Sequence, residues 1–307
     1  RPWKPPMYSK IMVPLDGSRI AENALPYARA LARGLKVPVD LLCVIDLAEM
    51  ERNVSVAEGL FLDTLAEDET RRRGEYLSQI AKSFSGAPVQ CKIEKGNAAS
   101  VIIESAATEK DTLVCMATHG RSGLKRWLLG SVAEKVLRGA SAPLLLIRAS
   151  ETAQTEGETR LGAVIVPLDG SSLAEQVLAS VTDLAKPLDL EVILFRAYRI
   201  PFGVYGAGAS FAIDLERLSA EVEAEVQQYL EVKRDALAKA GLEKVSYASK
   251  EGLSADEIIK YGHRNPEKLI AMCSHGRSGV KRWVLGSVTE TVVRHCGAPV
   301  LIVRAAV

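Results

Sequence analysis

The residues best suited to chemistry lie in one loop that the chain contains twice. The first copy reads HGRSGLKRWLLGSVAEKVLRGASAPLLLIRA, from His119 to Ala149, and the second reads HGRSGVKRWVLGSVTETVVRHCGAPVLIVRA, from His275 to Ala305. Each begins with Gly, Ser, His, Arg and Lys, and then reaches a Gly-Ser that opens an apolar-periodic segment. A glycine-rich loop that ends at the start of a helix can hold an anion on its backbone N–H groups.

A phosphate group would suit this pattern. Ser131 and Ser287 would open the following helix, where the hydroxyl and a backbone N–H can both donate to phosphate oxygens, and Arg121 and Arg277 could make bidentate contacts. In the alternative interpretation, Gly-Ser is only a helix N-cap and the glycines only serve the turn. From the residues alone both interpretations stay open.

A second polar feature follows the first apolar run of each half. Lys10–Asp16 reads KIMVPLD and Ala163–Asp169 reads AVIVPLD, and Gly-Ser follows both. Runs without alternation are typical of parallel strands buried on both faces. Ligands of open parallel sheets bind beyond the carboxyl ends of the strands, where the strand order reverses. If the first and fourth strands are neighbours, Asp16 and Asp169 face the same crevice as the loops.

The elements that must position these residues alternate between strand and helix five times in each half. The pattern predicts a tandem duplication of a doubly wound α/β unit, with domains at 7–149 and 161–306 and a polar linker at 150–160. Gly34 and Pro187 are expected to end the first long helix of each half. Arg71–Arg73 are expected on an exposed helix face, because acidic residues lie nearby. The first ten residues are expected to be a disordered or trimmed leader.

On these residues the chain resembles a tandem universal stress protein, from Lys10 to Ala149 and from Ala163 to Ala305. Nucleotide-binding members of that family carry G-x-x-G, nine residues and then G-[ST]. The second and third glycines match Gly120 and Gly130 in the first half, with Ser131 following, and Gly276 and Gly286 in the second half, with Ser287 following. The first glycine is replaced by Ala117 and by Cys273. Cysteine adds more bulk than alanine, so the second half departs further from the family pattern than the first.

The resemblance implies two Rossmann-like domains of the adenine nucleotide alpha hydrolase-like type, with five strands each, related by pseudo-two-fold symmetry. It also implies that the last strands, Leu144–Ile147 and Val300–Val303, pair with each other within the chain. Such pairing would cover an apolar edge that otherwise invites association. A further homodimer stays open.

The resemblance further implies an adenine nucleotide ligand, ATP or else ADP or AMP, with Mg²⁺ or Mn²⁺ held mainly by phosphates and water. In the first half the implied nucleotide-binding residues are Pro14, Leu15, Asp16, Val44, Met116, Ala117, His119, Gly120, Arg121, Gly130, Ser131 and Val132. In the second half they are Pro167, Leu168, Asp169, Ala197, Met272, Cys273, His275, Gly276, Arg277, Gly286, Ser287 and Val288. The first residues of each list, through Val44 and Ala197, would border the adenine.

Composition excludes several function classes. The 307 residues carry a formal net charge of +1, which disfavours nucleic acid and anionic membrane as partners. No apolar run approaches the length of a membrane span. The five cysteines form no CxxC pair, which favours a reduced, cytoplasmic protein.

Three functional hypotheses remain. The chain lacks a P-loop and a G-x-S-x-G elbow, and it offers no base beyond Asp16 and Asp169, so rapid ATP turnover is not expected. The leading hypothesis is an ATP-binding stress-response sensor or signalling protein without a catalytic residue. The alternatives are a nucleotide-independent interaction scaffold and a slow ATPase.

Overall fold

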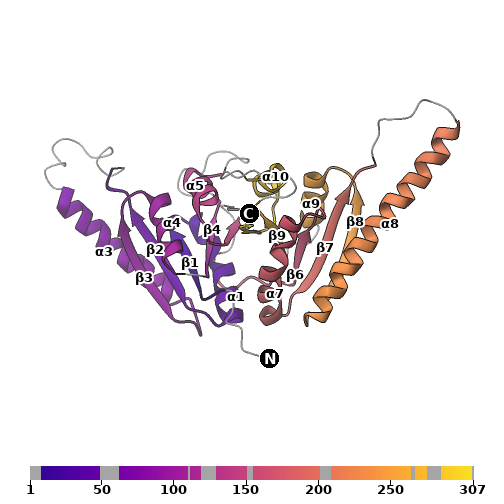
Figure 1. The fold of residues 1–307 in the computed structure, drawn as a ribbon. Coiled ribbons are helices and arrows are strands. Elements are labelled where there is room, and N and C mark those ends of the chain that lie inside the picture. The colour runs from indigo at the N-terminus through magenta and orange to yellow at the C-terminus, as the bar shows by residue number, and fades with distance from the viewer. Residues whose placement is uncertain are drawn as a thin grey trace. The chain divides into compact units, whose positions relative to one another are not determined.

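The chain forms two compact units, each with a sheet and helices (Figure 1). The computed structural model describes residues 8–48, 62–109, 111–118, 129–150, 155–200, 209–263, 267–274 and 285–305. Unit 1 comprises residues 1–160 together with 299–304, and unit 2 comprises 161–298 and 305–307.

The sheet of unit 1 has five parallel strands in the order β3-β2-β1-β4-β5, followed by one antiparallel strand, β10. The strands are β1 (Lys10–Leu15), β2 (Val39–Ile45), β3 (Val89–Lys95), β4 (Thr112–Ala117), β5 (Leu144–Ile147) and β10 (Val300–Val303). All of them except β3, at the edge, are almost entirely buried. Apolar runs without alternation therefore become parallel strands, as predicted.

Helices cover this sheet in layers. They are the 3₁₀ helix η1 (Ala21–Ala24), α1 (Leu25–Leu35), α3 (Leu62–Ala81), α4 (Ala98–Thr108) and α5 (Ser131–Gly139). Tyr76 of α3 donates to Glu22 of η1 at 2.9 Å, which ties these two helical segments together. Helices α4 and α5 are also close to each other, because a Cβ added at Gly139 of α5 would lie 2.5 Å from the side chain of Ile103 of α4. Glycine at the end of α5 therefore allows α4 and α5 to pack closely.

Strand β10 comes from the second half of the sequence but belongs to unit 1. It pairs antiparallel with β5, with Val300 opposite Leu146 and Ile302 opposite Leu144. The predicted pairing of Leu144–Ile147 with Val300–Val303 within one chain is confirmed. The pairing covers the β5 edge, which would otherwise expose unsatisfied backbone groups.

The end of the linker also docks on unit 1. The buried Arg29 of α1 donates to the carbonyls of Thr155 and Gly157 at 2.8 and 2.7 Å, and its Nε donates to Ser83. The backbone N–H of Thr159 donates to the carbonyl of Pro26. Residues 155–159 are thus held by hydrogen bonds to buried groups, although their composition is polar.

Unit 2 repeats the parallel order as β8-β7-β6-β9. Its strands are β6 (Ala163–Pro167), β7 (Glu191–Tyr198), β8 (Val245–Glu251) and β9 (Lys268–Cys273). Its helices are α6 (Ser172–Glu175), α7 (Val177–Leu188), α8 (Ala209–Lys239), α9 (Ser254–His263) and α10 (Ser287–His295). The predicted α/β fold with mostly parallel strands is confirmed in both halves.

Two predicted helix ends are wrong. Gly34 lies inside α1, which ends at Leu35, and Pro187 lies in the last turn of α7. The chain leaves each helix through a left-handed residue, Lys36 with φ 57° and Asp189 with φ 53°. A left-handed residue ends a helix by turning the chain, and in both helices this residue comes two positions after the expected signal.

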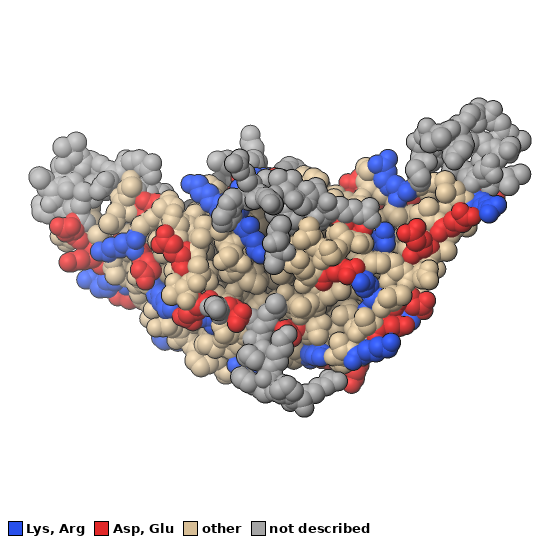
Figure 2. Space-filling model, in the orientation of Figure 1, with Lys and Arg blue, Asp and Glu red and all other residues tan. Residues whose placement is uncertain are grey.

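The charge distribution agrees with the balanced composition. Figure 2 shows basic and acidic residues interspersed over the visible face of the described residues. In the part of the chain that the structure describes, no helix is both long and apolar enough to cross a membrane.

Candidate functional site

The carboxyl ends of β1 and β4 lie side by side in unit 1. The two strands are parallel neighbours, with Lys10 opposite Thr112 and Met12 opposite Val114. The strand order reverses here, because β2 and β3 follow β1 on one side while β5 follows β4 on the other. The condition set by the sequence is therefore met: Asp16 and the segment after β4 leave the sheet at its topological switch point.

Asp16 is locked in a tight turn directly after β1. Its Oδ1 accepts hydrogen bonds from the backbone N–H of Ser18 at 2.9 Å and from the Ser18 hydroxyl at 2.6 Å. The Ser18 hydroxyl oxygen in turn accepts the N–H of Ala21, at the start of η1. Gly17 has a φ of 76°, a left-handed value that glycine adopts without strain. The Asp-Gly-Ser sequence thus builds a rigid turn that holds one carboxylate at the edge of the sheet.

The start of α5 is anchored to the end of β4. The N–H of Thr118 donates to the carbonyl of Ile147 at 2.9 Å, and the carbonyl of Thr118 accepts the N–H of Gly130 at 2.6 Å. Gly130 is the N-cap, with φ −61° and ψ 148°, so its backbone does not require glycine. The first N–H groups of a helix have no intrahelical acceptor, and a glycine N-cap brings no side chain to accept from Val132 or Ala133.

This geometry changes the two interpretations of the Gly-Ser pair. Ser131 is the first residue inside the helix and not the N-cap, and its side chain is exposed. The N–H of Gly130 is already bonded to Thr118, so the donors available to an anion are those of the first helical turn. Among the described residues this helix start is open, meaning that no acceptor is bonded to its first N–H groups, and such an N-terminus with a serine hydroxyl beside it is suited to phosphate.

Unit 2 repeats these contacts closely. Oδ1 of Asp169 accepts the N–H and hydroxyl of Ser171 at 2.9 and 2.6 Å, and Gly170 has a φ of 85°. Strand β6 is the parallel neighbour of β9. The N–H of Gly286, the N-cap of α10, donates to the carbonyl of Ser274 at 2.8 Å. Each unit therefore presents its aspartate turn and its open helix start from neighbouring strands.

The other predicted residues fall into three groups. Buried residues at the strand ends are Leu15, Met116, Ala117, Pro167, Leu168, Met272 and Cys273. Partly exposed residues at the same edges are Pro14, Asp16, Val44, Gly130, Val132, Asp169, Ala197, Gly286 and Val288, and the two serines are exposed. The loop residues His119, Gly120, Arg121, His275, Gly276 and Arg277 lie outside the described residues.

The two replacements of the family glycine occupy the same position in their units but differ in chemistry. Ala117 and Cys273 are both buried at the last position of their strands. Burial raises the pKa of the Cys273 thiol to about 11, although a backbone hydrogen bond at Val177 works in the opposite direction. The thiol therefore stays protonated at neutral pH. Among the described residues, no three His, Cys, Asp or Glu side chains form a potential metal site.

Two arginines beside the turns were not predicted as site residues. Arg73 of α3 was expected on an exposed face, but this is wrong: only 9% of the residue is exposed, and its Nη1 donates to the carbonyl of Asp16. Its Nε also pairs with Glu69 at 2.6 Å. The signal missed was that Arg73 lies four residues before Leu77, an apolar residue that is fully buried on the same helix.

Unit 2 has an arginine near its turn that comes from another element. The guanidinium of Arg196, on β7, lies 4.7 Å from the centre of the Tyr229 ring and within 3.3 Å of the Cβ that Gly170 would carry. Tyr229 donates to Glu175 at 2.8 Å, as Tyr76 does to Glu22 in unit 1. Burial and the neighbouring glutamate raise the pKa of both tyrosines, so both hydroxyls remain protonated donors.

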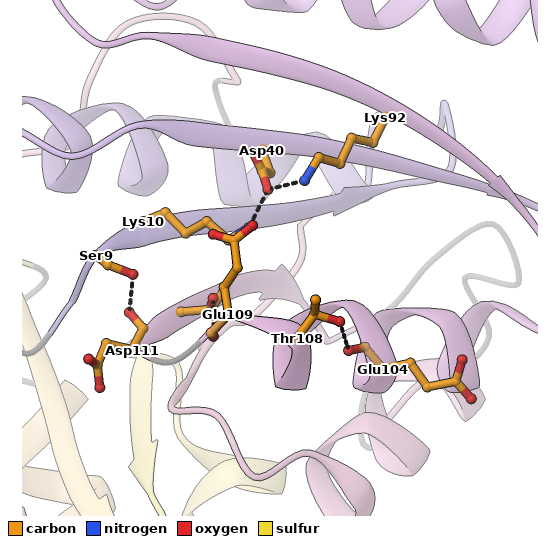
Figure 3. A network of polar contacts seen from close by, with 9 residues as sticks. Ser9, Lys10, Asp40, Lys92, Glu104, Thr108, Glu109 and Asp111 are labelled. Atoms are coloured by element: carbon orange, nitrogen blue, oxygen red, sulfur yellow. Dashed lines mark hydrogen bonds and ion pairs between the residues drawn. The ribbon is translucent and has the colours of Figure 1, made fainter.

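The opposite, amino-terminal edge of the unit 1 sheet carries a buried ionic network (Figure 3). Asp40 accepts hydrogen bonds from Lys10 at 2.6 Å and from Lys92 at 2.8 Å, and Lys10 also pairs with Glu109 at 2.7 Å. Lys10 and Asp40 are each only 4% exposed. The two carboxylates neutralise the two lysines within the cluster, so we assign this network a role in stability.

Comparison with known proteins decides the family. The sequence model of the universal stress protein family matches residues 7–148 and again residues 161–304. The chain belongs to the universal stress protein family. Its two matching regions make it a tandem, two-domain member.

Relatives of this universal stress protein include both full-length and single-domain proteins. A universal stress protein of Mycolicibacterium smegmatis is 24% identical over 311 residues, which cover 96% of this chain and 96% of the relative. Universal stress protein MJ0531 of Methanocaldococcus jannaschii is 29% identical over 142 residues, covering 46% of this chain and 83% of the relative. The crystal structure of a universal stress protein from Archaeoglobus fulgidus aligns with a TM-score of 0.70 at 20% identity, covering 97% of this chain and 99% of that one.

Proposed function

We propose that this universal stress protein binds an adenine nucleotide, ATP being the best candidate, at the carboxyl edge of each sheet. It acts in the cytoplasm as a stress-response sensor or signalling protein whose partners depend on nucleotide occupancy. The observation that carries this proposal is the convergence, in both units, of an aspartate turn and an open helix N-terminus on neighbouring strands.

The two features divide the work of binding. The first-turn N–H groups of α5 and the Ser131 hydroxyl would donate to phosphate oxygens, and the helix dipole favours the negative charge. Asp16 would border the adenine and ribose, as the family resemblance implies, and its turn holds it at the neighbouring strand end. Ser287 and Asp169 take the same roles in unit 2.

A divalent cation fits this proposal only as a companion of the phosphates. The described residues supply no cluster of three metal ligands, so Mg²⁺ or Mn²⁺ would be held by phosphate oxygens and water. When bound, the ion would neutralise phosphate charge. Oδ1 of Asp16 is committed to two hydrogen bonds in its turn, which disfavours it as a base for water activation and supports binding without rapid turnover.

A nucleotide-independent scaffold remains the second candidate, on one specific observation. Ala117 and Cys273 stand where nucleotide-binding members of the family carry the first glycine, and both are buried at the strand ends. In a scaffold, the open helix starts would have no anion to bind, and charge at Ser131 would leave partner binding unchanged.

Ser131→Asp separates an anion site from a purely structural helix start. A carboxylate at the first helical residue interacts favourably with the helix dipole and stabilises the helix by about 0.3–1 kcal/mol, but it repels a phosphate. We expect the ATP dissociation constant of unit 1 to rise on the order of 100-fold, because like charges placed together cost several kcal/mol. Calorimetric titration with ATP and Mg²⁺ measures the affinity, and thermal unfolding measures the stability.

The matched control is Ser131→Ala, which removes the hydroxyl and leaves the N–H groups. It should weaken ATP binding by only about fivefold, since one hydrogen bond is lost. Wild-type protein that releases no nucleotide on denaturation and shows no heat of ATP binding would refute the proposal. ATP affinity unchanged in Ser131→Asp would refute the role of the helix start.

A further inference from the structure

Arg304 joins the last strand of the chain to the end of helix α5. It follows β10 directly, and its guanidinium donates to three carbonyls at the carboxyl end of α5. Nε lies 2.7 Å from the carbonyl oxygen of Ala140, and Nη2 lies 2.7 Å from that of Arg138 and 3.3 Å from that of Leu137. The side chain is half-buried.

These contacts supply what the helix lacks at that end. The last carbonyls of an α-helix have no intrahelical donors, and α5 continues into an extended residue, Ala140, without a left-handed cap. A fixed cation beside these carbonyls also stabilises the helix dipole. The side chain of Arg304 therefore caps the carboxyl end of α5, although Arg304 lies far from α5 in the sequence.

A second path leads from the same segment to the start of α5. Strand β10 pairs with β5, and Ile147 at the end of β5 accepts the N–H of Thr118. The carbonyl of Thr118 then accepts the N–H of Gly130, the N-cap. The C-terminal segment thus holds α5 at its last turn directly and at its first turn through β5.

We propose that Arg304 is a positioning residue for the candidate site of unit 1, so that the C-terminal segment of the second half sets the affinity of the site in the first half. This inference rests on the proposed function, since the site is the open start of α5. Arg304 touches no ligand; it keeps the N–H groups of Ser131 and Val132 in the orientation that binding requires, which would otherwise be lost as the helix frays.

The test measures unit 1 alone, in the full chain carrying Ser287→Asp to disable the other site. Arg304→Ala is expected to raise the ATP dissociation constant about fivefold and to raise amide hydrogen exchange in α5 but not in α10. Arg304→Lys keeps the charge but loses the planar fork, and should recover about half of the effect on a logarithmic scale. Its milder change keeps the test valid if Arg304→Ala folds poorly.

Arg138→Ala is the matched control. Arg138 is an exposed arginine of the same helix whose side chain pairs with Glu134 at 3.1 Å, so its loss should change the ATP affinity less than twofold. ATP affinity that stays at the reference value in Arg304→Ala, while α5 exchange rises, would overturn the inference and leave the proposed function standing. Absence of ATP binding in the Ser287→Asp reference protein and in wild type would refute the proposed function, and this inference with it.

Discussion

The two units differ at one edge of the sheet and agree at the other. At the amino-terminal edge, Lys10, Asp40 and Lys92 of unit 1 correspond by strand register to Ala163, Ile193 and Ala248 of unit 2. A buried ionic network has therefore been exchanged for apolar packing. At the carboxyl edge, the aspartate turns have the same hydrogen bonds at the same distances. The fold accepts either solution at the amino-terminal edge, and the nucleotide sites proposed for both units would account for the agreement at the carboxyl edge.

The arginines beside the turns extend the comparison. In unit 1 the arginine is Arg73 on the helix, and the strand position carries Cys43, whose thiol donates to the carbonyl of Leu15. In unit 2 the strand position carries Arg196 and the helix position carries the buried Val226. A guanidinium beside the turn is kept while the element that supplies it changes. What both units retain is a guanidinium near the turn, and among the described contacts only that of Arg73 is hydrogen-bonded to it.

The largest expected effect comes from breaking the unit 1 network at its centre. Asp40→Asn leaves Lys10 and Lys92 without their shared carboxylate, and we expect the free energy of unfolding to fall by about 3 kcal/mol. Urea denaturation, combined with hydrogen exchange resolved by unit, measures the loss. At the corresponding position Ile193→Val should cost only about 1 kcal/mol. If Asp40→Asn lowered the free energy of unfolding by no more than Ile193→Val does, the network would contribute no more than ordinary packing.

A smaller effect is expected from moving the arginine between elements. Arg73→Val removes the hydrogen bond to the Asp16 carbonyl and the pair with Glu69, and should cost about 1.5 kcal/mol. Combining it with Cys43→Arg reproduces the unit 2 arrangement, with a guanidinium able to stack on Tyr76, and should recover part of that cost. A double-mutant cycle measures the coupling. Arg71→Val, which removes an exposed pair with Asp68, is the control. If the effects of Arg73→Val and Cys43→Arg simply add, an arginine on the strand does not replace the arginine on the helix.

The smallest effect at neutral pH is expected from copying unit 2 into unit 1. The combination of Lys10→Ala, Asp40→Ile and Lys92→Ala should change stability little at pH 7, because apolar replacement of a buried ion pair is often neutral. The difference should appear in the pH dependence. Burial alone would raise the pKa of Asp40, but hydrogen bonds and charges from the two lysines outweigh it and hold that pKa below the ordinary 3.8.

The sign of the pH dependence follows from these shifts. The stabilisation from Asp40 is fully present above pH 3.8 and is lost as the pH falls through the lower folded pKa. Burial works against the charged form of Lys10, but Asp40 and Glu109 raise its pKa above 10.5, so its contribution is lost only as the pH rises through that folded value. Unfolding titrations from pH 2 to 11 should be flatter at both ends for the apolar variant. Superimposable curves would contradict the role assigned to the network.

Much of the fold could be predicted because its signals are local. Buried parallel strands such as Val39–Ile45 are apolar without alternation, and the repeat locates their counterparts in the second half. The positions of Asp16 and Asp169 at the strand ends were predicted, but the hydrogen-bonded turns that they form were not. Pro187 was misleading because a proline in the last turn removes few hydrogen bonds, so α7 continues past it to Leu188.

Long-range contacts could not be predicted in the same way. Arg73 was assigned to an exposed face from the acidic residues around it, but the side on which α3 packs decides its burial. The reach of Arg304 to α5 depends on the antiparallel β5–β10 register, which nothing near Arg304 in the sequence specifies.

Counting bound nucleotides tests the central claim most directly. Native mass spectrometry of the intact chain with ATP and Mg²⁺, applied to wild type, Ser131→Asp, Ser287→Asp and the double variant, measures the occupancy of each unit separately. We expect two nucleotides on the wild type, one on each single variant and none on the double variant. No nucleotide on the wild type, or the same number on the wild type and the double variant, would contradict nucleotide binding at the open starts of α5 and α10.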